Sequence, residues 1–252
     1  PLYALNEKGY KNIINLSSAS YLRNDELSDP HITFDYLLNN SEGVALFSGT
    51  VFGLFGKLFD KGKFTEIHDL YNKIKLKFGD RFYIEIQRHK DLNETGFEKF
   101  NLNKSSDLEI PIIATNEVYY LNKDMHEAHD ALICIGNKTY VNEKNRLKLS
   151  DQHYFKNNSE MSELFADLPE ALENNYNFPL RCNFRPLFSN PILPNISQDK
   201  GGDADEILKK ESLEGLRIKF EKVFRVSIND IETEKSYLDY KKRLDHELSI
   251  II

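Results

Sequence analysis

Short apolar runs alternate with amphipathic patterns through the first half of the chain. Three runs are apolar enough to predict buried strands, at residues 44–49, 82–87 and 111–115. Around them, apolar residues recur at the spacing of an amphipathic helix with one apolar face. The helices expected from this spacing are 6–22, 33–38, 51–59, 65–78 and one within 93–103. Short strands alternating with helices predict βαβ units, so we expect an α/β fold with a mainly parallel sheet.

After residue 124 the pattern is helical, without intervening strands. The helical pieces expected there are 126–135, 150–154, 159–165 and 169–176. Ser159 and Asp167 are candidate N-caps, and Pro169 follows Asp167 at a tolerated first-turn position. Residues 185–203 are rich in Pro, Asn and Gly, and two amphipathic helices are expected beyond them, at 204–223 and 231–250. The predicted organisation is therefore a first region at 1–184, a linker at 185–203 and a second region at 204–252.

Composition narrows the class of protein. Of 252 residues, 40% are hydrophobic and 29% are charged, which is typical of a globular protein. No apolar run approaches the 18 or more residues of a membrane span, so we expect a cytoplasmic protein with no membrane partner. The net charge of −7 by itself gives no support to nucleic-acid binding. Two cysteines, Cys134 and Cys182, fit a reducing compartment. Because the chain starts at Pro1 and ends in an apolar stretch, we expect both ends to continue in a longer protein.

Polar groups follow two of the predicted strands, in the strings FYIEIQRH (82–89) and IATNEVYY (113–120). The carboxyl ends of strands build the active sites of α/β barrels. With ELFADLPEAL (163–172) and LFSG (46–49), these strings resemble a polymerase-and-histidinol-phosphatase (PHP) domain, in particular that of the bacterial DNA polymerase III alpha subunits. Residues 2–12 (LYALNEKGYKN) resemble a helix of that domain.

Two later strings extend the resemblance, EGL (214–216, after LKK at 208–210) to the opening of the polymerase palm and YKKRLDHEL (240–248) to a helix of that region. The implied fold is the second half of a PHP domain, a distorted TIM-like α/β barrel. A mainly helical segment would follow it and lead into a polymerase palm.

The resemblance implies a function for the full-length protein and a limited role for this chain. The full-length protein would be a DNA-directed DNA polymerase, a nucleotidyltransferase of DNA replication that uses Mg²⁺. Its catalytic aspartates would lie beyond Ile252, so we expect no catalytic residue here and assign no nucleic-acid-binding residue. The implied partners are a DNA primer–template, deoxynucleoside triphosphates, a proofreading exonuclease subunit, the sliding clamp and other replisome subunits. The chain itself would be a structural scaffold.

A PHP metal site collects His, Asp and Glu ligands that activate water for phosphodiester hydrolysis. His89 stands where the family often has a ligand, and Glu117 and Tyr119 stand where it has Asp-x-His. Glutamate can bind a divalent metal, but a protonated phenol is a poor ligand. The sequence therefore predicts a degraded PHP metal site at His89, Glu117 and Tyr119, which makes Zn²⁺ or Mn²⁺ doubtful there. Without a metal, His89 would be a capped or solvated strand-end residue, and Glu117 would cap a loop or pair with a nearby Lys or Arg.

Other residues and functions remain as alternatives. His126 and His129 share a helical face at i, i+3, a spacing that can hold a metal, but no third ligand is evident, so a structural role is favoured. Two other classes of function compete with the scaffold. One is an active metal-dependent phosphoesterase, either proofreading or stand-alone, and the other is a non-catalytic binding module.

Overall fold

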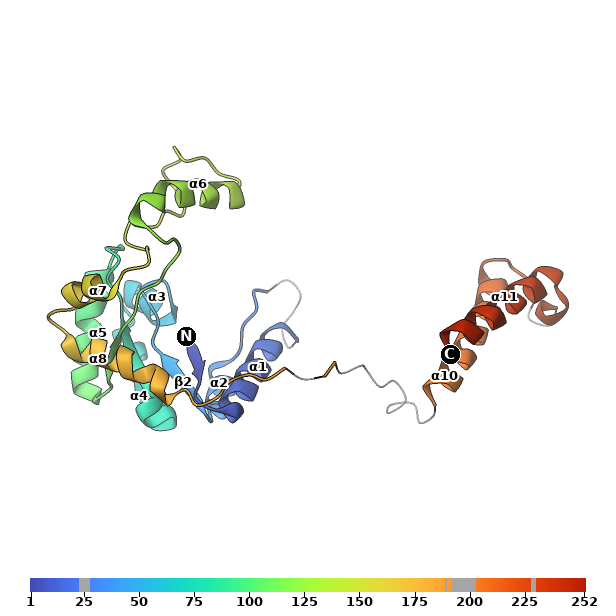
Figure 1. Cartoon of the computed structure of the whole chain (residues 1–252), viewed down its shortest axis with the longest axis horizontal. Helices are drawn as coiled ribbons and strands as arrows, with labels where there is room; N and C mark the ends of the chain where they lie inside the picture. Colours follow the sequence, from blue (N-terminus) through green and yellow to red (C-terminus); the bar gives the residue numbers. More distant parts are fainter. Residues whose placement is uncertain (23–27, 189, 192–202, 228–229) are drawn as a thin grey trace. The chain divides into compact units, whose positions relative to one another are not determined.

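The chain forms two compact units, Pro1–Leu187 and Phe188–Ile252 (Figure 1). The computed structural model describes residues 1–22, 28–188, 190–191, 203–227 and 230–252. Most of the linker expected at 185–203 lies outside these described residues. Within the described ranges, no helix has both the length and the apolar character needed to cross a membrane.

A four-stranded mixed sheet organises the first unit. The strands are β1 (Leu2–Ala4), β2 (Val44–Phe47), β3 (Phe82–Ile86) and β4 (Ile112–Ala114), in the order β1-β2-β3-β4. The β1–β2 pair is antiparallel, and the other two pairs are parallel. The α/β fold and the three expected strands are confirmed.

The strand β1 corrects the sequence analysis, which placed its residues in a helix. It has only three residues, and its register with β2 pairs Leu2 with Leu46. So short a strand shows no periodicity of its own and exists through its pairing. The helix begins afterwards, where Asn6 Oδ1 accepts a 2.9 Å hydrogen bond from the Gly9 N–H.

Helices surround the sheet and account for most of the remaining residues of the first unit. They are α1 (Glu7–Leu22), α2 (Phe34–Asn39), α3 (Leu54–Asp60), α4 (Phe64–Phe78), α5 (Glu94–Leu108), α6 (His126–Gly136), α7 (Asn158–Leu164) and α8 (Pro169–Asn177). Short 3₁₀ turns lie at η1 (Gly79–Arg81), η2 (Lys123–Met125) and η3 (Phe178–Arg181). Helix α6 and the loop that joins it to β4 project beyond the sheet, and α6 stands apart from the other helices of the first unit (Figure 1).

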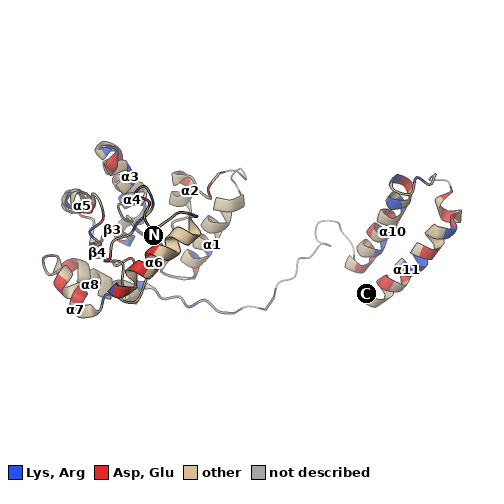
Figure 2. Ribbon diagram, turned by 90° about the horizontal axis from the view of Figure 1, so that it is seen from above, with Lys and Arg blue, Asp and Glu red and all other residues tan. Residues whose placement is uncertain are grey.

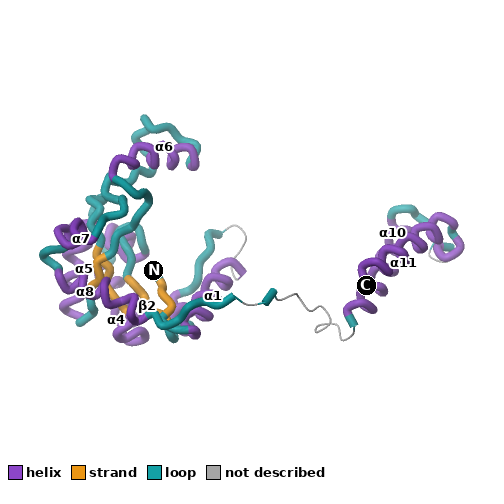
Figure 3. The backbone as a smooth tube through the Cα atoms, viewed as in Figure 1, coloured by secondary structure: helices purple, strands orange, loops and turns teal. Residues whose placement is uncertain are grey.

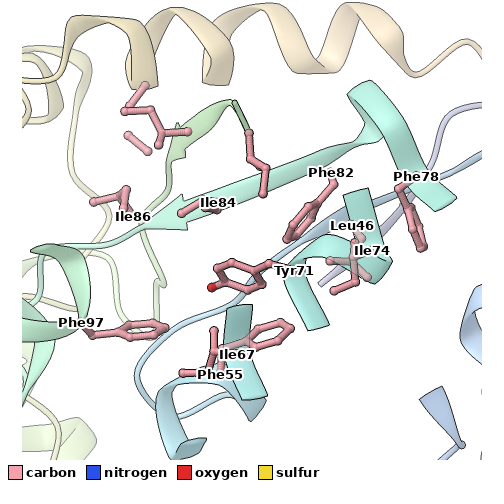
Figure 4. Packing of buried hydrophobic residues seen from close by; sticks show 14 of the residues in the cluster. Leu46, Phe55, Ile67, Tyr71, Ile74, Phe78, Phe82, Ile84, Ile86 and Phe97 are labelled. Atoms are coloured by element: carbon pink, nitrogen blue, oxygen red, sulfur yellow. The ribbon is translucent and has the colours of Figure 1, made fainter. Parts of the chain in front are cut away.

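Both faces of the central strands are buried, because alternate side chains enter two different apolar clusters. On one face, Phe82, Ile84 and Ile86 pack with the apolar side of α4, and Tyr71 lies at the centre of this cluster with no exposed surface. Figure 4 shows these side chains gathered on one side of β3. On the other face, Tyr83 packs with Phe47 and Phe178.

Helix α8 covers the β4 edge of the sheet. The side-chain amides of Asn174 and Asn175 donate to the carbonyl oxygens of Ile112 and Ala114 in β4, at 2.8 and 2.6 Å. These side chains satisfy backbone acceptors that an edge strand would otherwise expose. The edge is thereby closed to pairing by another chain.

Two local predictions in the α7 region are wrong. Residues 150–154 are not helical; Tyr154 instead forms an isolated parallel bridge with Tyr120. The N-cap of α7 is Asn157 rather than Ser159, because Asn157 and Glu160 form a reciprocal capping box. In both places the local sequence allowed more than one structure, and hydrogen bonds formed in the folded protein determined which one is present.

The second unit contains α10 (Ala204–Lys222), the turn η4 (Ile231–Thr233) and α11 (Lys235–Ile251). Its buried side chains include Leu216, Phe220, Ile231 and Tyr237. Figure 2 shows acidic and basic residues interspersed along both helices, a pattern typical of solvated helical faces.

Replacing Gly9 by alanine is expected to destabilise the first unit by about 1–3 kcal/mol, the usual cost of overpacking. A Cβ at this position would lie 1.8 Å from the Gly43 carbonyl oxygen, so backbone must move. The measurement is urea unfolding at equilibrium.

The matched control is Gly136→Ala in α6, where an added Cβ meets nothing within 4 Å. Alanine is the better helix former by up to about 1 kcal/mol, so this variant should be neutral or stabilised. Equal losses in the two variants would contradict the close-packing argument.

Candidate metal centre

A tight turn after β3 presents His89 and Asp91 at the carboxyl end of the sheet. Lys90, between them, has φ 62°, a left-handed conformation that costs energy for a residue with a side chain. The Glu94 carboxylate holds the turn by accepting hydrogen bonds from the backbone N–H groups of His89 (2.8 Å) and Lys90 (2.7 Å). This carboxylate is therefore occupied by backbone donors.

The segment 150–156 lies across the ends of β3 and β4. Its Ser150 hydroxyl donates to the His89 carbonyl oxygen. The His153 carbonyl accepts from the Tyr119 N–H at 2.9 Å, and the Phe155 N–H donates to Tyr120 at 3.0 Å. Figure 3 shows that the chain beyond the strand ends, toward α6, consists mostly of loops. Hydrogen bonds between loops therefore bring His153 to the strand ends.

His89, Asp91 and His153 form the one group of potential metal ligands found in the described part of the chain. One donor atom from each lies within 4.8 Å of the others. The His153 side chain is fully buried, and its Nε2 is 3.3 Å from Asp91 Oδ2. The two imidazole rings stack face to face, with centroids 4.1 Å apart and planes 3° from parallel.

The hydrogen-bond partner of His153 indicates which nitrogen of that ring is the donor. His153 Nδ1 faces the Glu117 carbonyl oxygen at 3.2 Å, and a carbonyl can only accept. His89 Nε2 lies 3.2 Å from the Glu117 backbone N–H, which is a donor, and 3.1 Å from Asn116 Oδ1, which is an acceptor. His153 Nε2 lies 3.3 Å from Asp91 Oδ2 and has no hydrogen-bond partner among the described residues.

The donor set fits a metal in identity and spacing, but only partly in orientation. Two imidazoles and a carboxylate suit Zn²⁺ and similar ions. Imidazole lone pairs lie in the ring plane, so one ion cannot sit in the planes of two parallel rings. His153 and Asp91 are placed for a metal, whereas His89 must tilt out of the stack to join them.

Of the site residues predicted from the sequence, only His89 belongs to this group. Glu117 and Tyr119 form a pair of their own, in which the Tyr119 hydroxyl donates to Glu117 Oε1 at 2.9 Å. The Tyr119 side chain is about half exposed, and its ring lies edge-on to His153 at 5.4 Å. The sequence analysis missed Asp91 and His153. Asp91 follows His89 by two positions, but nothing in the local sequence marks His153.

Further rings extend from this group toward α6. The His129 ring packs against Tyr119 and Tyr120, at 5.5 and 5.3 Å. The His126 Nε2 lies 3.0 Å from the Leu149 carbonyl oxygen. Neither histidine belongs to the group of potential ligands. Their contacts are those of packing residues that connect α6 to the strand-end loops.

Arg88 fastens the strand-end region to the helical segment that follows. Its guanidinium donates to Glu98 at 2.5 Å, to both carboxylate oxygens of Asp167 at 2.6 and 2.8 Å and to the Leu164 carbonyl at 2.6 Å. It also stacks over the Phe165 ring. These hydrogen bonds from Arg88 lower the pKa of Asp167. Asp167 is thus an ion-pair partner rather than the helix cap suggested by its position before Pro169.

Comparison with known proteins shows which proteins the chain is similar to. Residues 1–89 match the PHP domain. The chain is 38% identical over 250 residues to the DNA polymerase III subunit alpha of Caulobacter vibrioides, 38% over 251 to that of Rickettsia bellii and 32% over 252 to that of Pseudomonas aeruginosa. Each alignment covers at least 99% of this chain and 21% of the relative, so the chain spans about a fifth of their length. Over nearly its whole length, the chain is therefore similar to one segment of the DNA polymerase III alpha subunits, and its first 89 residues match the PHP domain.

Proposed function

We propose that this chain is part of a DNA polymerase III alpha subunit that extends primers on a DNA template, and that its own role is structural. The observation that carries this proposal is the similarity to alpha subunits through both compact units. Catalytic Mg²⁺ would be bound outside the chain. The substrates would be the primer–template and deoxynucleoside triphosphates, and the replisome partners would include a proofreading exonuclease and the sliding clamp.

The regions proposed from the sequence fit this role. Residues 1–184 would be the PHP part with its helical extension, 185–203 a linker, and 204–252 the start of the palm region. The polar faces of α10 and α11 include ion pairs such as Arg243 with Glu247 at 2.8 Å. Paired surface charges of this kind are typical of a solvated face or an intramolecular contact, and they do not single out a nucleic-acid surface.

The Glu117–Tyr119 pair supports a structural role for these two positions. Burial and the hydrogen bond to Glu117 raise the pKa of Tyr119 to about 12. The phenol is therefore protonated at neutral pH and occupies the carboxylate by donating to it. A protonated phenol is a poor metal ligand, so this pair is poorly suited to the Asp-x-His role in hydrolysis.

The structural proposal is tested by primer extension with the full-length protein. Glu117→Gln and Tyr119→Phe are expected to leave the extension rate within about twofold of wild type, because these side chains touch no polymerase substrate in this proposal. Arg88→Gln should lower the thermal midpoint, since it breaks the bonds to Glu98 and Asp167.

Absence of primer extension by the wild-type protein would refute the polymerase assignment. Metal-dependent phosphodiester hydrolysis lost in Glu117→Gln would instead support the phosphoesterase alternative. Folded, polymerase-inactive protein that binds replisome subunits would support the binding-module alternative.

The ionisation of Tyr119 gives a second prediction. In Glu117→Gln, the pKa of Tyr119 should fall but stay above its usual value of about 10, because the carboxylate is gone while burial persists. The measurement is ¹³C-tyrosine NMR from pH 8 to 11, with the Tyr119 resonance identified in Tyr119→Phe. At pH 11 roughly a tenth of wild-type Tyr119 should be ionised, and more in the variant. Identical titration curves would show that Glu117 does not hold the phenol.

A further inference from the structure

We propose that the loop 137–148 (the α6 loop), which follows α6, binds single-stranded DNA through the side chains of Lys138, Lys144, Lys148 and Tyr140. The lysine ammonium groups pair with phosphates, and the tyrosine ring stacks on an unpaired base. The inference rests on the proposed function, because primer extension supplies a single-stranded template. The surface it assigns lies on the projecting α6 region rather than at the strand ends.

The first argument is the local charge of the α6 loop. Residues 137–148 include four basic residues and a single acidic one, Glu143, which gives the loop a net charge of +3 in a chain whose net charge is −7. Nucleic-acid affinity comes mainly from Lys and Arg side chains that neutralise phosphates. The loop is therefore a basic surface in an acidic chain, and the total charge conceals it.

The second argument is that three of the four basic side chains are available to a ligand. Arg146 is the exception, because it is buried and forms a two-pronged ion pair with Asp130, with both distances 2.6 Å. Lys138, Lys144 and Lys148 are exposed, and none of them has an ion-pair partner among the described residues. Helix α6 and this loop project from the rest of the first unit, so a DNA strand can approach them (Figure 1).

The third argument is that the α6 loop is held in one shape. Besides its ion pair, the Arg146 guanidinium donates to the Val141 carbonyl oxygen at 3.0 Å. The Thr139 hydroxyl donates to the Glu143 carboxylate at 2.7 Å. Lys138 has φ 53°, a left-handed conformation that costs energy and is concentrated at functional sites. A loop that is ordered before binding loses less conformational entropy when the ligand arrives.

The fourth argument selects a single strand as the ligand. Tyr140 is 73% exposed and lies between Lys138 and Lys144 in the sequence. Basic surfaces that also present aromatic rings are the usual construction for binding single strands, because every unpaired base offers a face on which a ring can stack. The bases of a duplex are already stacked on each other, and an acidic protein segment offers no such face. The exposed ring therefore favours single-stranded DNA over both.

The first experiment measures binding of a labelled single-stranded oligonucleotide to the full-length protein, by fluorescence anisotropy at several salt concentrations. Replacing Lys138, Lys144 and Lys148 together by Gln should reduce the slope of log K against log salt concentration by about 2, since each phosphate contact contributes roughly 0.7. Tyr140→Ser should weaken binding at least about fivefold, the lower end of the contribution of one stacked base. Tyr140→Phe should bind as wild type does, because phenylalanine still stacks.

The matched control removes the same charge from another part of the first unit. Lys73 and Lys77 of α4 and Lys99 of α5 are exposed lysines outside the α6 loop. Their joint replacement by Gln should leave the salt slope unchanged. An equal reduction of the slope in this control would show that only net charge matters, and it would overturn the assignment to the α6 loop.

Photochemical cross-linking locates the contact without any variant. A single strand containing 5-iododeoxyuridine is irradiated with the full-length protein, and the cross-linked peptide is identified by mass spectrometry. The expected adduct lies within residues 137–148, at Tyr140. Absence of an adduct in this segment overturns the proposal, and so does an unchanged salt slope in the triple variant of the α6 loop.

Two further outcomes separate this inference from its alternatives. Normal primer extension by wild-type protein without an adduct in the α6 loop would refute this inference alone, whereas an adduct without extension would refute the polymerase assignment alone. Loss of a replisome subunit from the triple variant, with unchanged affinity for DNA, would assign the loop to a protein partner and overturn the proposal.

Discussion

Burial of both faces of β2, β3 and β4 is the constraint on which the rest of the first unit depends. Along each of these strands, alternate side chains enter two different apolar clusters. A shift of one residue in register would therefore move every side chain from its own cluster to the opposite face of the sheet. The register is therefore firmly held, and with it the place where each strand ends. This is why His89 and Asn116, from separate strands, lie with Nε2 and Oδ1 only 3.1 Å apart.

The same construction separates the core from the strand-end chemistry. The core is made by residues inside the strands and by α4, whereas the polar groups come from the loops beyond. A side chain at the strand ends, such as that of Tyr119, can therefore change without disturbing the packed cluster around Tyr71. Polar groups at the strand ends can change while the sheet persists, and the segment 150–156 adds further polar groups there.

The candidate site was predictable only where its residues follow a recognisable strand. His89 and Glu117 were singled out because the strings around them resemble the strand ends of a PHP domain, and the structure places both just after β3 and β4. His153 comes from a stretch whose local pattern was mistaken for helix, and its partners are backbone groups of residues 117 and 119. The position of Asp91 depends on the left-handed backbone conformation of Lys90. A lysine in the sequence does not predict that conformation.

By itself, the sequence determined the α/β class, three of the four strands and most of the helices, because apolar periodicity is a local property that each segment carries alone. It also carried the resemblance to the DNA polymerase III alpha subunits, through strings of residues that keep their order along the chain. Tertiary structure decided what depends on pairing: the strand β1, the bridge between Tyr120 and Tyr154, and the meeting of His153 with His89. Ser150 reaches His89 from 61 positions away, and no local pattern can specify a contact between segments that only folding brings together.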